Sequence, residues 1–278
     1  MMSDKSKKLK VGIVGCGAIG SSLAKVIVKE FSKLAKLVAL YDIDIEKAQR
    51  LSRTISKKKN LVVVSQEQLI NRSSLIIESA SSTCSWDIAK AVLSKGRDIM
   101  IMSVGGIAGH FKQLSVLTET HNSQVYIPSG AISGIDALKA AKMGKIKKVI
   151  LTTRKNPISF KGVKFIEDKG IRLKNLKKDK VLFSGTAAKA VKYFPQNINV
   201  AAVLSIAGRG PNKTTVRIIA SPSTTKNIHE IQIESSAGRI FTRTENILHP
   251  ENPKTSYLAV LSAVATLKQI LEPIKIGT

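Results

Sequence analysis

The segment VGIVGCGAIG, residues 11–20, constrains the fold of this chain more than any other feature. It places three glycines in G-x-G-x-x-G order between a β-rich run and a segment with helical spacing of its apolar residues. Glycines in that context permit a tight turn and let a pyrophosphate approach the N-terminus of the following helix. The sequence therefore predicts a dinucleotide-binding βαβ unit, whose cofactor-binding loop contains Gly15, Gly17, Ala18, Ile19 and Gly20.

Asp42 supplies a second part of this predicted cofactor site. It ends the next apolar run, AKLVALYD at 35–42, about where an acidic residue accepts hydrogen bonds from an adenosine ribose. A carboxylate there repels a 2′-phosphate and so favours NAD over NADP. Lys47 and Arg50 lie nearby and could accommodate NADP, so both cofactors stay open.

Strand-like and helix-like segments alternate up to about residue 128. Helical patterns at 21–34, 45–56 and 86–96 are interleaved with β-like runs, among them NLVVVS at 60–65 and RDIMIMSVGG at 97–106. Alternation of this kind indicates an α/β fold with a Rossmann-type, doubly wound parallel sheet.

The second half of the chain has a different texture. β-branched runs dominate, and SSAG at 235–238 is a hairpin signal. We expect a second α+β domain at 129–252 that carries the substrate and dimer surfaces. The apolar spacing after Pro253 predicts a C-terminal helix at 253–278 that returns to the first domain at 1–128 and completes it.

The chain is strongly basic, with 45 Lys+Arg against 19 Asp+Glu and a formal net charge of +26. A polyanion partner such as nucleic acid is the functional interpretation, and a solvated basic surface is the alternative. The lysines are spread along the chain without interleaved aromatic residues, so nucleic acid is not expected as the biological target.

Hydropathy and cysteine content indicate the cellular compartment in which the protein is expected. No apolar run approaches the roughly 18 residues of a membrane span, and the basic N-terminus lacks a secretory pattern, so we expect a cytoplasmic protein. Cys16 and Cys84 are too few for a metal cluster or a disulfide framework, and no metal is expected.

Four histidines are candidates for proton transfer. His229, in NIHEIQIES, shares strand parity with Ile231 and Ile233, so from the residues alone it is either a hydrogen-bonded core histidine or a catalytic one. His249, just before a proline, is expected in a loop with a structural role. His110 and His121 are expected at the surface.

Five motifs distributed over nearly the whole chain resemble the L-aspartate dehydrogenase family: VGIVGCGAIG, MSVGG at 102–106, PSGAISGIDAL at 128–138, FPQNINVAAVLSIAG at 194–208 and ENPKTSYLAVLS at 251–262. The resemblance implies a nucleotide domain, a second domain with homodimer contacts, and a last helix that returns to the first. It also implies that His229 is catalytic and that Ala131 and Asn199 touch the cofactor near its nicotinamide. The chain departs from the family in SASSTCSWDIAK at 79–90, which leaves cofactor contacts from Ser81 and Ser82 open.

The activity implied is NAD(P)-dependent oxidation of L-aspartate to iminoaspartate, and so to oxaloacetate and ammonia, or the reverse amination. The product could feed NAD biosynthesis. A substrate with two carboxylates needs a cationic, hydrogen-bonding pocket, and Lys254, Thr255 and Ser256 are the candidates, at the start of an expected helix whose dipole favours an anion. The alternative for these three residues is an ordinary helix cap.

Three other functions fit parts of the sequence. A homoserine or semialdehyde dehydrogenase would share the fold, and the aldehyde version would need Cys84 as nucleophile. A reductase of cyclic imines would lack its usual basic motif. A NAD-sensing polyanion binder would rest on the charge and the glycine loop alone.

Overall fold

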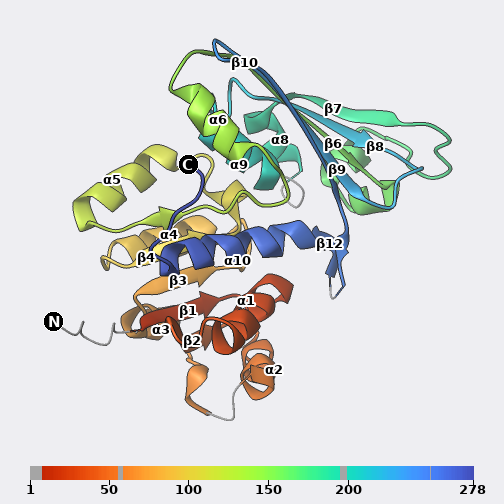
Figure 1. Cartoon of the computed structure of the whole chain (residues 1–278). Helices are drawn as coiled ribbons and strands as arrows, with labels where there is room; N and C mark the ends of the chain where they lie inside the picture. The colour runs from red at the N-terminus through yellow and green to blue at the C-terminus, as the bar shows by residue number, and fades with distance from the viewer. Residues whose placement is uncertain (1–7, 56–58, 195–198, 251) are drawn as a thin grey trace. The chain divides into compact units, whose positions relative to one another are not determined.

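The computed structural model describes residues 8–55, 59–194, 199–250 and 252–278 (Figure 1). The side chains of Lys59, Pro253 and Lys254 are also outside this description. The chain divides into two compact units, one ending at Pro128 and completed by Ala263–Ile276, the other formed by Ser129–Ser262 with Gly277–Thr278. The assignment of 129–252 as a substrate and dimerisation domain stays a prediction.

The first unit is built on a five-stranded sheet with the order β2-β1-β3-β4-β5, in which every pairing is parallel. Helices pack on both faces (Figure 1), and the short strands are therefore continuous apolar runs. The strands are β1 (Leu9–Val14), β2 (Ala35–Tyr41), β3 (Leu75–Glu78), β4 (Asp98–Ile101) and β5 (Val125–Tyr126). The helices are α1 (Ala18–Lys29), α2 (Ile45–Ile55), α3 (Gln66–Arg72), α4 (Ser85–Leu93) and α5 (Phe111–His121), with short 3-10 turns η1 (Lys59–Leu61) and η2 (Val104–Gly106).

Strand order in this sheet reverses between β1 and β3. In open parallel sheets the crevice beside the carboxyl ends of strands at such a switch point is where ligands bind. The loops after β1, β3 and β4 all leave from that edge. The predicted Rossmann-type α/β fold is confirmed.

One predicted strand of this unit is wrong. The run NLVVVS at 60–65 forms the turn η1 and a single bridge between Leu40 and Val62. Ser65 caps α3 by accepting a hydrogen bond from the backbone N–H of Gln68, so only residues 62–64 remain between η1 and the cap. Val64 is 72% exposed.

The predicted C-terminal helix is α10 (Tyr257–Leu271). Ala263 and Leu267 are fully buried in the core of the first unit, with Val264, Ile270 and Leu271 packed against it, which confirms the returning helix. Its predicted start near Pro253 is wrong. Residues Asn252–Ser256 form β12, which pairs with β11 (Leu248–His249).

The second unit contains a mixed five-stranded sheet with the order β10-β9-β6-β8-β7. The strands are β6 (Ile146–Lys155), β7 (Lys180–Thr186), β8 (Thr215–Ala220), β9 (Asn227–Ser235) and β10 (Gly238–Asn246). The pairing of β6 with β8 is parallel and the others are antiparallel. The predicted hairpin at SSAG joins β9 to β10, where Ser235 is opposite Gly238.

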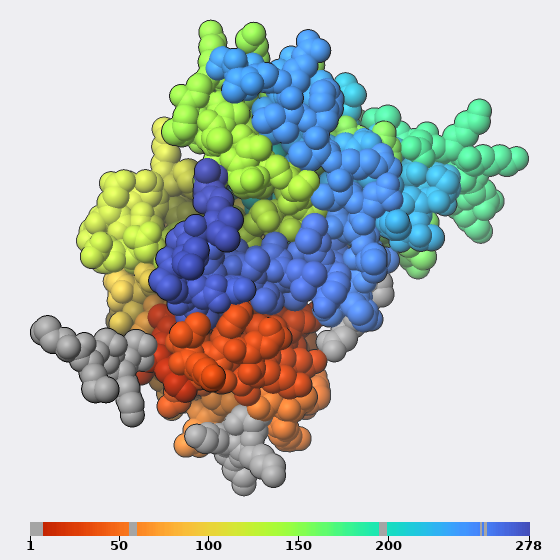
Figure 2. All heavy atoms as spheres, in the orientation of Figure 1, coloured from red at the N-terminus to blue at the C-terminus, as the bar shows by residue number. Residues whose placement is uncertain are grey.

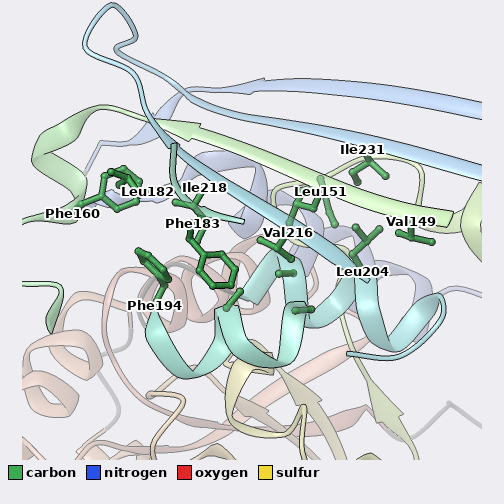
Figure 3. Close-up of a cluster of buried hydrophobic side chains, with 14 of the residues drawn as sticks. Val149, Leu151, Phe160, Leu182, Phe183, Phe194, Leu204, Val216, Ile218 and Ile231 are labelled. Atoms are coloured by element: carbon green, nitrogen blue, oxygen red, sulfur yellow. The ribbon is translucent and has the colours of Figure 1, made fainter. Parts of the chain in front are cut away.

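Helices α8 (Ala187–Tyr193) and α9 (Asn199–Ala207) cover one face of this sheet. The hydrophobic core of the unit lies between these two helices and the sheet (Figure 3). Phe160, Phe183 and Phe194 fill one end of this core, and aliphatic side chains fill the other. The unit also contains α6 (Ile135–Lys142), α7 (Lys164–Asp168) and the 3-10 turn η3 (Pro157–Phe160). Among the described residues, no helix is long and apolar enough to cross a membrane.

Candidate functional site

The glycine loop between β1 and α1 has the geometry of a phosphate cradle. Gly15 has a φ of +91°, and a Cβ there would lie 2.6 Å from the backbone of Ser79. A Cβ on Gly20 would lie 2.0 Å from the carbonyl oxygen of Gly15, so only glycine lets the helix approach the strand. At Gly17, the N-cap of α1, nothing lies within 4 Å of an added Cβ. The two outer glycines therefore shape the loop, and the middle one leaves room for a ligand at the helix N-terminus, where Ala18 and Ile19 begin the helix.

Asp42, directly after β2, fastens the same loop. One carboxylate oxygen accepts a hydrogen bond from the backbone N–H of Cys16 at 2.7 Å, and the other accepts one from the N–H of Asp44 at 2.9 Å. Each carboxylate oxygen has a second lone pair, so the group can still accept from a ribose hydroxyl. Burial, followed by the charge of Asp42, raises the pKa of the Cys16 thiol to about 12, so this sulfur stays protonated.

Glu78, the last residue of β3, ties two loops together at the carboxyl edge of the sheet. Its side chain is fully buried and accepts from the backbone N–H of Ala80 at 2.8 Å and of Ser103 at 2.9 Å. Desolvation raises the pKa of Glu78 despite these hydrogen bonds. The loops after β3 and β4 are thus held in fixed relation to each other, beside the glycine loop after β1.

His229 lies on β9, with its side chain on the buried face of the second sheet. The ring is 3% exposed, and its Nδ1 lies 2.8 Å from the hydroxyl of Thr153 on the neighbouring strand β6. Burial, followed by the positive charge of Lys155, lowers the pKa of His229 to about 3. The imidazole is therefore neutral at cellular pH, with one of its nitrogens already assigned to a partner.

Lys155, the last residue of β6, belongs to the same cluster. It lies two positions after Thr153 and so on the same face of the strand, and it is 7% exposed. Burial lowers the pKa of Lys155 to about 8. A buried ammonium beside a buried imidazole is costly for stability and is a common arrangement at functional sites.

A hydrogen-bond network joins this cluster to other candidate residues. Asn246 Nδ2 donates to the carbonyl of Ala131 at 3.0 Å and to that of Asn227 at 3.3 Å. Thr244, opposite His229 on β10, also donates to the Ala131 carbonyl, at 3.1 Å. The backbone of Ala131 is therefore fixed beside the strand that carries His229.

Two of the three predicted substrate ligands are described. Ser256 is buried, and its hydroxyl accepts from Asn227 Nδ2 at 3.1 Å, which brings it into the network. The Thr255 hydroxyl accepts from Asn252 Nδ2 at 3.2 Å. Both lie on β12, in front of a helix that begins at Tyr257, and not within its first turn. The side chain of Lys254 lies outside the described residues.

Asn199, the other residue predicted to touch the cofactor, is exposed and is the first residue of α9. The residues before it, 195–198, are outside the described part of the chain.

The other histidines lie elsewhere. His249 is on β11, not in the predicted loop, and is buried with its ring 5.6 Å from that of Tyr257 in an edge-to-face contact. His110 stacks on Trp86 with ring centroids 4.3 Å apart and is half-buried, as is His121 at the end of α5. The predicted surface position of these two is therefore only partly right.

Cys84 does not have the surroundings of a nucleophile. Its sulfur lies 3.3 Å from the Ser81 hydroxyl and 3.5 Å from the Ser81 carbonyl, and neither group is a base. Within the described ranges, no group of three or more His, Cys, Asp or Glu residues could hold a metal ion.

Sequence reasoning missed four members of the cluster: Thr153, Lys155, Asn227 and Asn246. A signal was present in strand parity. On one face of β6, every second residue runs from the aliphatic Val149 and Leu151 to the polar Thr153 and Lys155. On the same face of β9, Ile233 and Ile231 are followed in the same way by His229 and Asn227. Because these strands are antiparallel, both inward faces change from aliphatic to polar at the same edge of the sheet.

One exposed segment carries several of the basic residues. The stretch from Lys161 to Asp179, green and projecting in Figure 2, carries exposed Lys161, Lys164, Lys169, Arg172, Lys174, Lys177 and Lys178 among exposed Glu167, Asp168 and Asp179. This pattern is that of a solvated basic surface.

Both the sequence and the fold of this chain are similar to those of known proteins. The family model described as "Aspartate dehydrogenase, C-terminal" matches residues 136–270, and the model described as "Homoserine dehydrogenase, NAD binding domain" matches residues 15–128. The L-aspartate dehydrogenase of Methanosarcina barkeri is 44% identical over 272 residues, which cover 97% of this chain and 100% of the relative. That of Methanosarcina acetivorans is 46% identical with the same coverage. The crystal structure of aspartate dehydrogenase from Thermotoga maritima matches with a TM-score of 0.69 and 27% identity, over 98% of this chain and 100% of that one.

Proposed function

The chain belongs to the L-aspartate dehydrogenase family, and from that premise we propose that it interconverts L-aspartate with oxaloacetate and ammonia. In the oxidative direction the Cα–H and amine of aspartate become an imine, and water then releases ammonia and leaves the oxo acid. A bound nicotinamide dinucleotide supplies the hydride acceptor. The protein must bind both molecules, orient Cα and move protons.

The observation that carries this proposal is the His229 cluster. A neutral, buried imidazole is held at one nitrogen by Thr153, beside the ammonium of Lys155. When Nδ1–H donates to the Thr153 hydroxyl, the lone pair is on Nε2, which can then accept a proton from the substrate amine or from the attacking water. The Thr153 hydroxyl can serve as this acceptor, and the contact is therefore compatible with the tautomer that a base requires.

The residues of the glycine loop fit a dinucleotide. The open space at Gly17 and the N-terminus of α1 would hold the pyrophosphate, and Asp42 would accept from the adenosine ribose. The carboxylate of Asp42 favours NAD, while Lys47 and Arg50 leave NADP open. Ala131 and Asn199 would contact the nicotinamide end, and Thr255 and Ser256, with Lys254, would contact the substrate.

An amino-acid panel tests this function. The full chain is incubated with NAD or NADP and with L-aspartate, L-glutamate, L-alanine and L-homoserine, and NADH or NADPH absorbance is followed. We expect reduced cofactor with L-aspartate alone. Turnover of homoserine would favour the homoserine dehydrogenase alternative, and no turnover of any amino acid would contradict the proposal.

The enzyme's setting is part of the same proposal. Two free thiols suit the reducing cytoplasm. A homodimer is part of the proposal because the resemblance to the L-aspartate dehydrogenase family implies one. A role of the product, iminoaspartate, in NAD biosynthesis is implied by the family resemblance. Light scattering on the purified protein tests the dimer by its mass.

A further inference from the structure

Among the described residues of the second unit, Lys155 is the buried charged side chain that the proposed roles leave unexplained. It shares its strand face with Thr153, and its charge acts on His229 across the sheet. Aliphatic side chains continue this face away from the cluster, at Leu151 and Val149. Burying a lysine at this position costs desolvation free energy, which an apolar side chain in the same place would not.

The carboxylates of β9, Glu230 and Glu234, lie on the opposite face. Glu230 pairs with Arg154 and Arg243, and Asp179 lies 3.6 Å from Arg154. Glu234 lies 3.9 Å from Lys148. Of the described ionised groups on β6, β9 and β10, Lys155 is the one whose charge lowers the basicity of the His229 ring.

Taking the proposed reaction as given, we propose that Lys155 binds a carboxylate of the substrate, and that this ion pair is what enables His229 to accept a proton. Lys155 would thus recognise acidic substrates and control the base through one contact.

The physical basis is the balance of charge around the imidazole. In the free protein the ammonium opposes a second positive charge on the ring. A substrate carboxylate placed against the ammonium cancels that repulsion and adds an attraction to the imidazolium, so the pKa of His229 rises on binding. Because the cluster is buried, both effects are stronger than they would be in water.

Two consequences follow for substrate choice. A charge-assisted hydrogen bond from a buried lysine favours a ligand with a carboxylate over one that lacks it. A neutral ligand in the same place would leave the ammonium opposing the ring, so it would bind without activating the base. Recognition and reactivity are therefore coupled.

The first test is the variant Lys155→Gln, compared with Lys148→Gln. Lys148 lies on the same strand, is half exposed and lies 3.9 Å from Glu234, which makes it a matched control. We expect Lys155→Gln to raise the KM for L-aspartate by about 10- to 100-fold and to leave NADH affinity unchanged. Lys155→Arg should restore part of the loss, and Lys148→Gln should behave as wild type. An unchanged KM in a folded Lys155→Gln protein overturns the proposal.

The second test reads the base directly and needs no turnover. The protein carrying 13C-labelled histidine is titrated by NMR with and without succinate, an unreactive dicarboxylate, and His229→Asn identifies the signal. Succinate should raise the pKa of His229 in the wild type and not in Lys155→Gln. If Lys155→Gln fails to fold, the wild-type titration still decides, since no response to succinate contradicts the proposal.

The two proposals fail differently. If L-aspartate is not oxidised but succinate shifts the His229 titration, the aspartate function is wrong and the carboxylate site stands. If L-aspartate is oxidised, and if neither the KM nor the His229 titration differs between the wild type and Lys155→Gln, the enzyme assignment stands and this inference is wrong.

Discussion

The inward face of β9 changes from aliphatic to polar over three alternate positions, Ile231, His229 and Asn227. Strand parity predicted from the sequence that His229 faces the core, and it does. Parity could not distinguish a structural histidine from a catalytic one, because that depends on partners distant in sequence. Thr153 and Lys155 are those partners, and only the pairing of β6 with β9 brings them together.

Replacing His229 tests its role most directly. We expect His229→Asn to lower kcat by about 10²- to 10⁴-fold, the usual contribution of a general base. NADH affinity should be kept, because the glycine loop belongs to the other unit. Steady-state kinetics and NADH fluorescence titration measure the two effects, with His121→Asn as the control. Normal turnover by His229→Asn would remove the ring from the mechanism.

Lys155 should make the protein less stable at neutral pH. Its folded-state pKa, about 8, lies below the ordinary value of 10.5, so the folded state binds this proton less tightly than the unfolded state. Its contribution to stability is therefore present above about pH 10.5 and is lost as the pH falls through about 8. We expect Lys155→Met to raise Tm at about pH 7 and to change it little at about pH 10. Calorimetry at both pH values measures this, with Lys148→Met as control, and a lower Tm at pH 7 would show a net stabilising lysine.

In the turn from β1 to α1, glycine serves two different purposes: close packing of the helix against the strand, and space for a ligand. Gly20 is required by packing, since its Cβ would meet the Gly15 carbonyl at 2.0 Å, whereas Gly17 faces open space with an ordinary φ of −72°. Gly20→Ala should therefore destabilise the unit by about 1–3 kcal/mol. Gly17→Ala should unfold like the wild type yet weaken NADH binding about tenfold or more, because its methyl group occupies the phosphate approach.

Thermal unfolding and NADH titration of both glycine variants test this separation. A stable Gly17→Ala protein with unchanged NADH affinity would show that the pyrophosphate does not lie against that residue. A Gly20→Ala protein as stable as the wild type would show that the turn can relax.

Elements whose apolar residues repeat with a clear spacing could be predicted from the sequence. Elements whose bounds depend on hydrogen bonds at their ends could not. The glycine loop, the parallel sheet and the β9–β10 hairpin follow from local patterns. The run 60–65 has the composition of a strand, but its first residues form η1 and its last residue, Ser65, caps α3. Residues 253–256 were predicted to begin a helix but belong to β12, which pairs with β11. In both cases the deciding interaction was a hydrogen bond that periodicity does not record.

For the whole molecule, the net charge of +26 predicts non-specific attraction to polyanions. At about 50 mM salt we expect a gel shift with any duplex DNA, and at about 200 mM salt we expect its loss, because binding by phosphate contacts releases counterions. Oxidation of L-aspartate should be unaffected by DNA at the higher salt. A shift that survives the higher salt and depends on sequence would revive a nucleic-acid function.

The family was recognised from motifs distributed over nearly the whole chain and the α/β fold from alternating strand-like and helix-like segments, and both are confirmed. For the site, the sequence pointed to His229 and the glycine loop but also to a substrate loop, of which only Ser256 joins the described cluster. Buried polar side chains on separate strands leave no local pattern, so Lys155, Asn227 and Asn246 emerge only from the fold.

The protonated thiol of Cys16 has a practical consequence for labelling. Alkylating and oxidising reagents attack the thiolate, and a buried thiol with a pKa of about 12 supplies almost none at neutral pH. A maleimide fluorophore should therefore react at half-buried Cys84 and spare the cradle. A single dye at the start of α4 would then report cofactor arrival without mutagenesis.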